Sequence, residues 1–389
     1  MPDADTIYEI GSVTKTMTGL LLADAVVSGK ARLAQPAGEL LPAYAIPSRA
    51  GQAITLAQLA THFSGLPRLP ANLAPADMHN PYADYSTALL RAFLAEHALA
   101  RQPGAAYEYS NLGYGLLGTA LSEQAQLSYE ELLQARIFRP LGMASSSTVT
   151  TPALRARLAP GHLADGTPAS NWDFQAIAGA GAVRSSARDM IAYMQSYMRA
   201  PGPAQQLAVK PRQLLSGEGD GDGVRKAGLA WILDQAKGRP FAWHNGQTGG
   251  YASFAGYTLD GKRGVVILSS TAREVDGLGL GVLVPGSLPP LDTAAAAPRE
   301  IAIAPSELAQ YAGRYALAPA FILSVRQGPD GLLVGATGQG EAPVYASAKD
   351  SFFYKVVEAR LVFQRDAEGA ITGVVLHQNG QAVPGKRQP

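Results

Sequence analysis

Ser12 and Lys15 stand one helical turn apart in the stretch EIGSVTKTMT, which runs straight into the apolar segment GLLLADAVV. A serine in the first turn of a helix places its hydroxyl beside unpaired backbone N–H groups, in the positive field of the helix N-terminus. Lys15 projects from the same helix face, and a lysine amine kept neutral by burial can accept the seryl proton and activate the nucleophile. The alternative is an N-cap serine beside a solvated lysine, which is the commoner meaning of an isolated S-x-x-K pattern.

Tyr109, Ser110 and Asn111 form a second candidate group in the stretch PGAAYEYSNLGYGLLG, between a Pro-Gly pair and a glycine-rich apolar helix. We expect this group in a loop. A phenol beside an ammonium group can lose part of its proton and act as a base toward the leaving group, while the Asn111 amide can orient Lys15 or the substrate. The alternative is that all three residues are ordinary turn formers.

A third candidate group lies in the stretch WHNGQTGGYASF, where His244 and Gly246 begin a predicted strand. The glycine pair that follows allows close backbone approach. The edge of such a strand could pair with a substrate backbone and offer a backbone N–H, in addition to that of Ser12, to an oxyanion. The alternative is a glycine-rich hairpin with a surface histidine.

The elements that must position these groups are helices followed by strands. From Ser12 onward apolar residues recur at three- and four-residue spacing, which predicts an amphipathic helix that stops near Gly29. Segments opened by capping residues predict four more helices, TLAQLATHFSG, YSTALLRAFLAEHAL, SYEELLQARIFRPLGM and SARDMIAYMQSYMRA. Beyond Gly228 the segments LAWILDQ, PFAWHNGQTGG, YASFAGYTLD and RGVVILSST predict antiparallel strands. Together these patterns predict an α+β fold, with helices packed on an antiparallel sheet.

The C-terminal part of the chain has a different pattern. The stretch LVPGSLPPLDTAAAAPREIAIAP is rich in Pro and Ala without helical or strand periodicity, and predicts a linker. Beyond it, strand-like segments separated by GPDG, DAEG and NG turns predict hairpins that form a small β-barrel or sandwich. We therefore predict a large α+β domain at residues 1–285, a linker at 286–305 and a small all-β domain at 306–389.

Composition narrows the chemistry. The chain has 389 residues, enough for one large and one small domain. Lys plus Arg total 32 against 31 for Asp plus Glu, so no excess charge exists to bind nucleic acid or an acidic membrane surface. The absence of cysteine excludes disulfides, thiol catalysis and cysteine-ligated zinc. The apolar runs fall short of the roughly 20 residues that a transmembrane helix needs, and we find no export signal ahead of the first helix.

The three groups, in the order S-x-x-K, Y-x-N and basic residue-x-G, resemble the serine β-lactamase and penicillin-binding protein superfamily. The likeness is to its class C β-lactamase-like branch, near D-alanyl-D-alanine peptidases and family VIII esterases. It extends through ITLAQLATHFSGLP, PLGM, GAGAVRSSARDM and HNGQTGGYASFAGYTLDGKRGVVILSS, over about residues 6–272. The resemblance implies a β-lactamase/transpeptidase-like fold, in which an antiparallel sheet flanked by helices adjoins an all-helical region. The C-terminal hairpins resemble the lipocalin-like domains attached to some of these relatives.

The resemblance also implies roles for the first two groups. Ser12 would be the acylated nucleophile, Lys15 its proton partner and Tyr109 a general base or acid. Asn111 would hold the substrate amide and Lys15 in place. The implied reaction is acyl transfer through a covalent ester, with no metal or organic cofactor.

For the third group, the resemblance implies an oxyanion hole formed by the backbone N–H groups of Ser12 and Gln247, beside Gly246. His244 would contact Tyr109 or a substrate carboxylate. Typical class C β-lactamases have a lysine at the position of His244. A histidine is only partly charged at neutral pH, so we expect weaker and pH-dependent carboxylate recognition.

Several functions stay open at this point. The first is hydrolysis of a small-molecule or peptide substrate, either the amide bond of β-lactams or that of D-amino-acid peptides. The second is a carboxylesterase of small acyl esters, because esters need less leaving-group assistance. The third is a non-hydrolytic protein that binds penicillin or cell-wall fragments.

The N-terminus departs from the family pattern, which usually places a pair of strands ahead of the S-x-x-K helix. Only eleven residues precede Ser12, so either the chain is truncated or the sheet lacks those strands and exposes an edge. Homodimerisation by strand pairing is a hypothesis that follows from such an edge. Most relatives are exported, which implies the periplasm or the medium by analogy, while a cytoplasmic location stays open.

Overall fold

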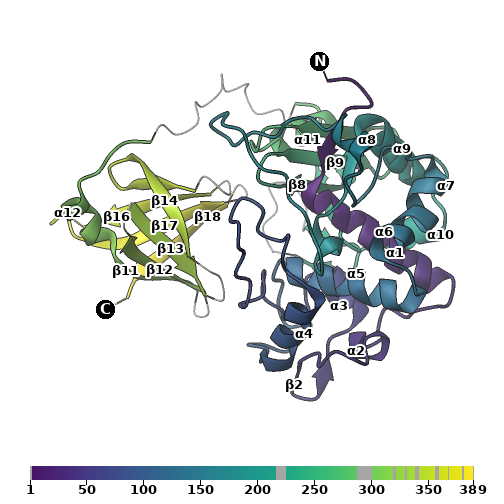
Figure 1. The fold of residues 1–389 in the computed structure, drawn as a ribbon, viewed down its shortest axis with the longest axis horizontal. Helices are drawn as coiled ribbons and strands as arrows, with labels where there is room; N and C mark the ends of the chain where they lie inside the picture. The colour runs from purple at the N-terminus through teal and green to yellow at the C-terminus, as the bar shows by residue number, and fades with distance from the viewer. Residues whose placement is uncertain are drawn as a thin grey trace. The chain divides into compact units, whose positions relative to one another are not determined.

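The structure is a computed structural model that describes residues 2–215, 225–286, 300–318, 321–328, 331–337, 341–354, 359–366, 368–378 and 381–388. The chain divides into two compact units, drawn in Figure 1. The first unit comprises Met1–His162 and Pro168–Leu291, and the second comprises Leu163–Thr167 and Asp292–Pro389. The candidate groups all lie in the first unit.

Helices form much of the first unit. Their bounds are α1 (Thr14–Val27), α2 (Ala37–Leu40), α3 (Leu56–Ala60), α4 (Thr87–Glu96), α5 (Asn111–Ala125), α6 (Tyr129–Leu133), α7 (Arg139–Leu141), α8 (Pro152–Arg155), α9 (Ala187–Met198), α10 (Pro203–Ala208) and α11 (Asp276–Leu283). The helices predicted at YSTALLRAFLAEHAL and SARDMIAYMQSYMRA are confirmed as α4 and α9, and each follows a serine whose side chain accepts a backbone N–H. The helix predicted at TLAQLATHFSG is only five residues long, because the chain turns away at His62 with a left-handed φ of 63°.

The helix that follows the candidate nucleophile Ser12 lies inside the first unit. A 3-10 turn, η1 (Gly11–Val13), carries Ser12 and leads directly into α1. The sequence pattern predicts an amphipathic helix, but α1 is buried on every face from its first residue to Ala23. The prediction of a one-sided apolar stripe is wrong because α5 and α10 both pack against α1 (Figure 1). Lys15 therefore starts a helix that is surrounded by protein.

An antiparallel sheet holds the third candidate group. Its strand order within the described residues is β10-β9-β8-β7-β6-β5. The bounds are β5 (Gln213–Leu214), β6 (Lys226–Ala227), β7 (Ile232–Ala236), β8 (Arg239–Gln247), β9 (Ala252–Thr258) and β10 (Gly264–Ser269). The HNGQTGG stretch ends β8 and turns into β9, with Gln247 opposite Ala252. A separate antiparallel pair joins β1 (Ile7–Glu9) to β4 (Arg184–Ser186).

These elements confirm the predicted α+β fold. Strand β10 pairs with β9 at one edge of the sheet, and dimerisation by strand pairing stays a prediction. None of the helices in the described ranges combines the length and the apolarity that a membrane crossing requires.

The second unit contains a closed antiparallel barrel, which settles the choice between barrel and sandwich. After a short helix α12 (Pro305–Leu308) the strands are β11 (Gly313–Ala318), β12 (Phe321–Gly328), β13 (Gly331–Ala336), β14 (Glu341–Ala348), β15 (Ser351–Phe353), β16 (Ala359–Arg365), β17 (Ile371–Gln378) and β18 (Gln381–Arg387). Aliphatic and aromatic side chains fill its core, and the Tyr311 ring centroid lies 4.9 Å from those of both Phe352 and Phe363. The likeness to lipocalins stays a prediction.

The predicted boundaries of the three parts of the chain also stay predictions. Of the linker predicted at 286–305, residues 287–299 lie outside the described part of the chain.

Candidate active site

The structure brings Ser12, Lys15 and Tyr109 together. The Lys15 Nζ atom lies 2.8 Å from Ser12 Oγ, and the Tyr109 hydroxyl lies 2.7 Å from the same oxygen. Ser12 comes from the turn η1, Lys15 from the first turn of α1, and Tyr109 from the loop that precedes α5. Two groups that can exchange protons therefore contact one hydroxyl, although one of them is 97 residues away in sequence.

Lys15 is fully buried, with none of its surface exposed. Burial, and secondarily the positive charge of Arg68, hold the pKa of Lys15 well below its ordinary value. The amine also contacts the carbonyl oxygen of Ala180 at 2.7 Å and lies 4.8 Å from the centroid of the Tyr109 ring. In its neutral form the amine donates to Ala180 O and accepts the Ser12 hydroxyl proton. This is the arrangement that a lysine base requires.

Tyr109 has the opposite protonation tendency from the one that the sequence suggests. Burial raises its pKa, and this outweighs the lowering by the Arg68 charge and by the hydrogen bond with Ser12. The expectation that the phenol loses part of its proton assumes a charged lysine beside it, and burial shifts that lysine toward its neutral form. Tyr109 is therefore a proton donor in the resting site, and its hydroxyl donates to Ser12 Oγ.

Close backbone contact positions the predicted oxyanion group. A Cβ atom at Gly246 would lie 2.1 Å from Ile10 O and 3.0 Å from the backbone nitrogen of Ser12. A Cβ atom at Gly11 would lie 2.7 Å from the backbone nitrogen of Gln247, and Gly11 itself has a φ of 47°. Only glycine fits both places. The end of β8 thus lies directly against η1, with the backbone nitrogens of Ser12 and Gln247 on neighbouring segments.

Asn111 stands at the first position of α5, and its backbone N–H donates to Arg68 O at 3.0 Å. Its side-chain oxygen is buried and has no hydrogen-bond partner among the described residues. The hydrogen bonds of Lys15 go to Ser12 and Ala180 rather than to Asn111. An unpartnered amide oxygen of this kind is available to a substrate N–H.

His244 is buried in the middle of the site rather than on a surface hairpin. Its side chain is 1% exposed, and its ring centroid lies 6.5 Å from that of Tyr109. Burial is the first cause that lowers the pKa of His244 to about 3. The Nδ1 atom lies 2.6 Å from Asn245 O, which assigns the proton of the neutral ring to Nδ1. The expectation of a partial charge at neutral pH therefore does not hold for the empty site.

The sequence analysis does not single out His62, which the structure places under Tyr109. The two rings are stacked with their centroids 4.3 Å apart, and His62 Nδ1 accepts the backbone N–H of Ser110 at 2.9 Å. Burial is the main cause that lowers the pKa of His62 well below its ordinary value. The histidine therefore supports Tyr109 as a neutral ring. The sequence signal for it is the stretch ITLAQLATHFSGLP, which carries part of the family resemblance.

Glu9 is a second buried polar group beside the site that sequence reasoning does not single out. Its Oε1 atom accepts hydrogen bonds from Asn171 Nδ2 at 3.0 Å and from the Trp172 backbone at 2.9 Å. The same oxygen lies 3.5 Å from Arg184, which ties the strand ahead of Ser12 to β4. A buried carboxylate with these partners is a structural anchor for the segment that carries the nucleophile.

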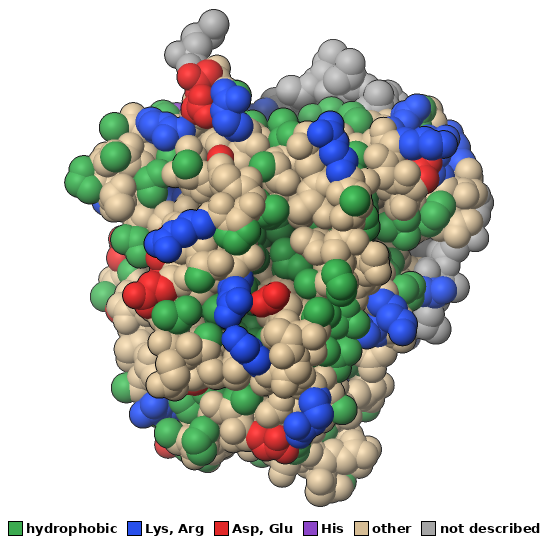
Figure 2. All heavy atoms as spheres, turned by 90° about the vertical axis from the view of Figure 1, so that its right-hand side faces the viewer, with side chains coloured by type: hydrophobic (Ala, Val, Ile, Leu, Met, Phe, Trp, Pro, Cys, Tyr) green, Lys and Arg blue, Asp and Glu red, His purple; other side chains and the backbone are tan. Residues whose placement is uncertain are grey.

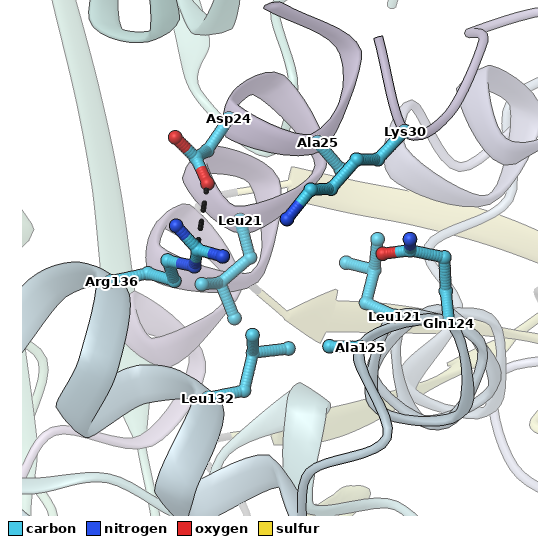
Figure 3. A pocket seen from close by; sticks show the side chains of 9 residues that line it. All are labelled: Leu21, Asp24, Ala25, Lys30, Leu121, Gln124, Ala125, Leu132 and Arg136. Atoms are coloured by element: carbon cyan, nitrogen blue, oxygen red, sulfur yellow. Dashed lines mark ion pairs between the residues drawn. The ribbon is translucent and has the colours of Figure 1, made fainter. Parts of the chain in front are cut away.

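One hollow elsewhere on the described part of the first unit offers no comparable chemistry. Figure 2 shows apolar side chains gathered in hollows between charged ones on the face that it draws. One hollow, drawn in Figure 3, is lined by Leu21, Asp24, Ala25, Lys30, Leu121, Gln124, Ala125, Leu132 and Arg136. Asp24 and Arg136 form an ion pair of 3.9 Å beside it. Its volume of about 20 Å³ has room for one water molecule and not for a substrate.

The sequence of this chain matches two known protein families. The sequence profile of the family described as Beta-lactamase matches residues 2–281. This match covers more than half of the chain, so the chain belongs to the β-lactamase family. A second profile, described as a domain of unknown function (DUF3471), matches residues 297–387.

Three known proteins illustrate what this chain is similar to, one by sequence and two by structure. D-alanyl-D-alanine-carboxypeptidase/endopeptidase AmpH of Escherichia coli is 34% identical over 200 residues, which are 51% of this chain and 50% of AmpH. The match thus spans half the length of that relative. The crystal structure of β-lactamase/D-alanine carboxypeptidase from Yersinia pestis complexed with citrate has a TM-score of 0.63 and 26% identity, over 72% of this chain and 84% of that one.

The octameric penicillin-binding protein homologue from Pyrococcus abyssi has a TM-score of 0.63 and 22% identity, over 98% of this chain and 88% of that one. At this identity the likeness shows the fold alone.

Proposed function

We propose that this protein is a serine hydrolase that forms an acyl-enzyme on Ser12 and cleaves the amide bond of β-lactams or D-amino-acid peptides. The observation that carries the proposal is the contact of Ser12 Oγ with both a buried lysine amine and a protonated tyrosine. Membership of the β-lactamase family and the likeness to carboxypeptidases support the choice of amide substrates.

In the acylation step Ser12 Oγ bonds to the substrate carbonyl carbon while its proton moves to Lys15 Nζ. Burial lowers the pKa of Lys15 and so favours its unprotonated form. An unprotonated amine has a free electron pair that can accept the seryl proton. The electrons of the carbonyl bond move onto the oxygen. In this proposed step the backbone N–H groups of Ser12 and Gln247 stabilise that oxyanion.

In the second half of acylation the carbon–nitrogen bond breaks, and the Tyr109 hydroxyl protonates the departing nitrogen. The proton held by Lys15 then returns to the Tyr109 phenolate, so both groups regain their resting states. Water next attacks the ester, and one of its protons passes to the Lys15–Tyr109 pair. A proton returns to Ser12 Oγ as the ester bond breaks, which completes hydrolysis.

Esters are the second candidate class of substrate. A phenolate or an alkoxide stabilised by the site leaves without the full protonation that an amine needs, so hydrolysis of small acyl esters depends less on Tyr109. The third candidate function is a non-hydrolytic protein that binds penicillin or cell-wall fragments. Such a protein would keep a stable acyl group on Ser12 and release little or no product.

The experiment uses the full chain with nitrocefin, 4-nitrophenyl butyrate and a D-alanyl-D-alanine peptide, together with intact-mass analysis after addition of penicillin. We expect turnover, and transient or stable mass addition at Ser12. Ser12→Ala should abolish both. Ser28→Ala is the matched control, because Ser28 follows the other end of α1 and its hydroxyl contacts only helix carbonyls.

The outcomes separate the candidates. Ester turnover without nitrocefin or peptide turnover favours the esterase, and a lasting adduct without product favours a binding protein. Turnover that survives Ser12→Ala would overturn the proposed nucleophile.

A further inference from the structure

Three basic side chains near Ser12 have lowered pKa values. Lys15, His62 and His244 are buried, and burial is the first cause that lowers the pKa of each. Burial therefore favours the neutral form of each of these side chains. Arg68 is the remaining basic group beside Tyr109, and a guanidinium keeps its charge in proteins.

Arg68 is held firmly at the start of α5. Its carbonyl oxygen accepts the backbone N–H groups of Asn111 at 3.0 Å and of Leu112 at 3.2 Å. The carbonyl oxygen of the preceding Pro67 accepts the Ser110 hydroxyl at 2.7 Å. These bonds fasten the loop of Arg68 to the turn that carries Tyr109, so the two side chains are positioned by one short segment.

The guanidinium of Arg68 lies over the ring of Tyr109, with 5.1 Å between its central carbon and the ring centroid. Its side chain is half-buried. No carboxylate among the described residues lies within ion-pair distance of it. Two other arginines of the first unit do have such partners: Arg184 contacts Asp173 at 3.0 Å, and Arg225 contacts Asp234 at 3.0 Å.

We propose that Arg68 binds the carboxylate of an anionic substrate whose scissile carbonyl lies at Ser12. The inference rests on the proposed hydrolase function and names its substrate class: acyl compounds with a free carboxylate, such as the terminus of a peptide or the acid group of a β-lactam. A neutral His244 at the start of the third motif supplies no charge for this purpose. A guanidinium without an anionic partner can bind a carboxylate through two parallel hydrogen bonds.

The test compares substrates that differ only in one charge. The first pair is 4-nitrophenyl succinate and its methyl ester, which place the carboxylate in the acyl part. The second pair is 3-acetoxybenzoate and its methyl ester, which place it in the leaving part. We expect wild-type enzyme to prefer the anionic member of at least one pair in kcat/KM, and Arg68→Gln to lower kcat/KM for that member about ten- to a hundredfold.

The neutral members separate charge recognition from damage to the site. Arg68→Gln should change their kcat/KM less than threefold, and Arg68→Lys should retain part of the preference for the anion. The matched control is Arg91→Gln, because the Arg91 guanidinium lies 4.6 Å over the Tyr44 ring in a similar contact and should leave both pairs unchanged. An equal loss for charged and neutral members would overturn the inference.

A measurement on the wild type covers the case in which the Arg68 variants fail to fold. Raising the salt concentration from low to 0.5 M should reduce the preference for the anionic member, because ions screen the attraction at a partly exposed guanidinium. A wild type that prefers the neutral members at low salt would contradict the role of Arg68. A complete lack of turnover, with no labelling of Ser12, would instead remove the proposed hydrolase function on which the inference rests.

Discussion

Each unit contains a tyrosine that contacts a basic side chain, and the pKa values of the two basic groups, Lys15 and Arg365, are shifted in opposite directions. In the first unit the Lys15 amine lies 4.8 Å from the Tyr109 ring centroid and contacts a serine hydroxyl. In the barrel the Arg365 guanidinium lies 5.7 Å from the Tyr311 ring centroid and contacts the Asp350 carboxylate at 2.6 Å.

The difference between the clusters is the counter-charge. In the barrel, the contact between Arg365 and Asp350 raises the pKa of Arg365. The same contact is the first cause that lowers the pKa of Asp350. That pair stays charged and joins β16 to the end of β14. Lys15 contacts a hydroxyl and a carbonyl, so burial favours its neutral form. Similar parts thus make a structural ion pair in one unit and a candidate base in the other.

The largest expected effect comes from removing the neutral amine. Lys15→Met keeps the volume of the side chain but has no proton acceptor, so kcat/KM should fall by roughly a thousandfold or more. The measurement is hydrolysis of 4-nitrophenyl butyrate at constant pH. Arg365→Met is the matched control in the barrel and should leave kcat/KM within twofold of wild type. Comparable losses in the two variants would break the comparison.

Replacement of each tyrosine by phenylalanine gives the next largest effect. Tyr109→Phe removes the proton donor to the leaving group and should lower kcat/KM for amides by roughly a hundredfold, with a smaller loss for nitrophenyl esters. Tyr311→Phe removes the hydroxyl that donates to Asp350 at 2.8 Å and should not alter turnover. Equal losses on amide and ester substrates would contradict the assignment of Tyr109 as an acid.

The barrel pair should matter for stability rather than for turnover. Asp350→Asn leaves the Arg365 guanidinium without its counter-charge, and both side chains are only about one-fifth exposed, at 21% and 20%. We expect the free energy of unfolding to fall by about 1 to 3 kcal/mol, measured by urea denaturation of the full chain and followed by a barrel-specific probe. An unchanged free energy of unfolding would show that the ion pair contributes little to stability, as exposed ion pairs often do.

A pH-dependent change in stability should also originate at Lys15. Its pKa is lower in the folded state than in the unfolded state, so the unfolded chain binds more protons between the two values and stability rises with pH across that window. Relative to Lys15→Met, wild type should gain up to about 1.4 kcal/mol of unfolding free energy for each pH unit toward the unfolded value. A difference that stays constant from pH 7 to pH 10 would show that Lys15 is charged when folded.

Residue spacing predicts the composition of the site but not its charge states. The pair Ser12 and Lys15 is found from sequence because one helical turn fixes the distance between them. Tyr109 is found through the order of three motifs. The protonation of Tyr109 and of His244 could not be predicted, since burial decides both and depends on segments far away in sequence. The stacked His62 and the unpaired Arg68 follow from the same packing.

The sequence of this protein determined its α+β elements, the glycines that let β8 approach η1, and the reactive side chains, because these depend on local spacing and on residue type. Tertiary structure alone decided that α1 is buried on every face as far as Ala23, and hence that the pKa of its lysine is lowered. The cost of placing a charge in an apolar interior depends on everything packed around it, and no single segment carries that information.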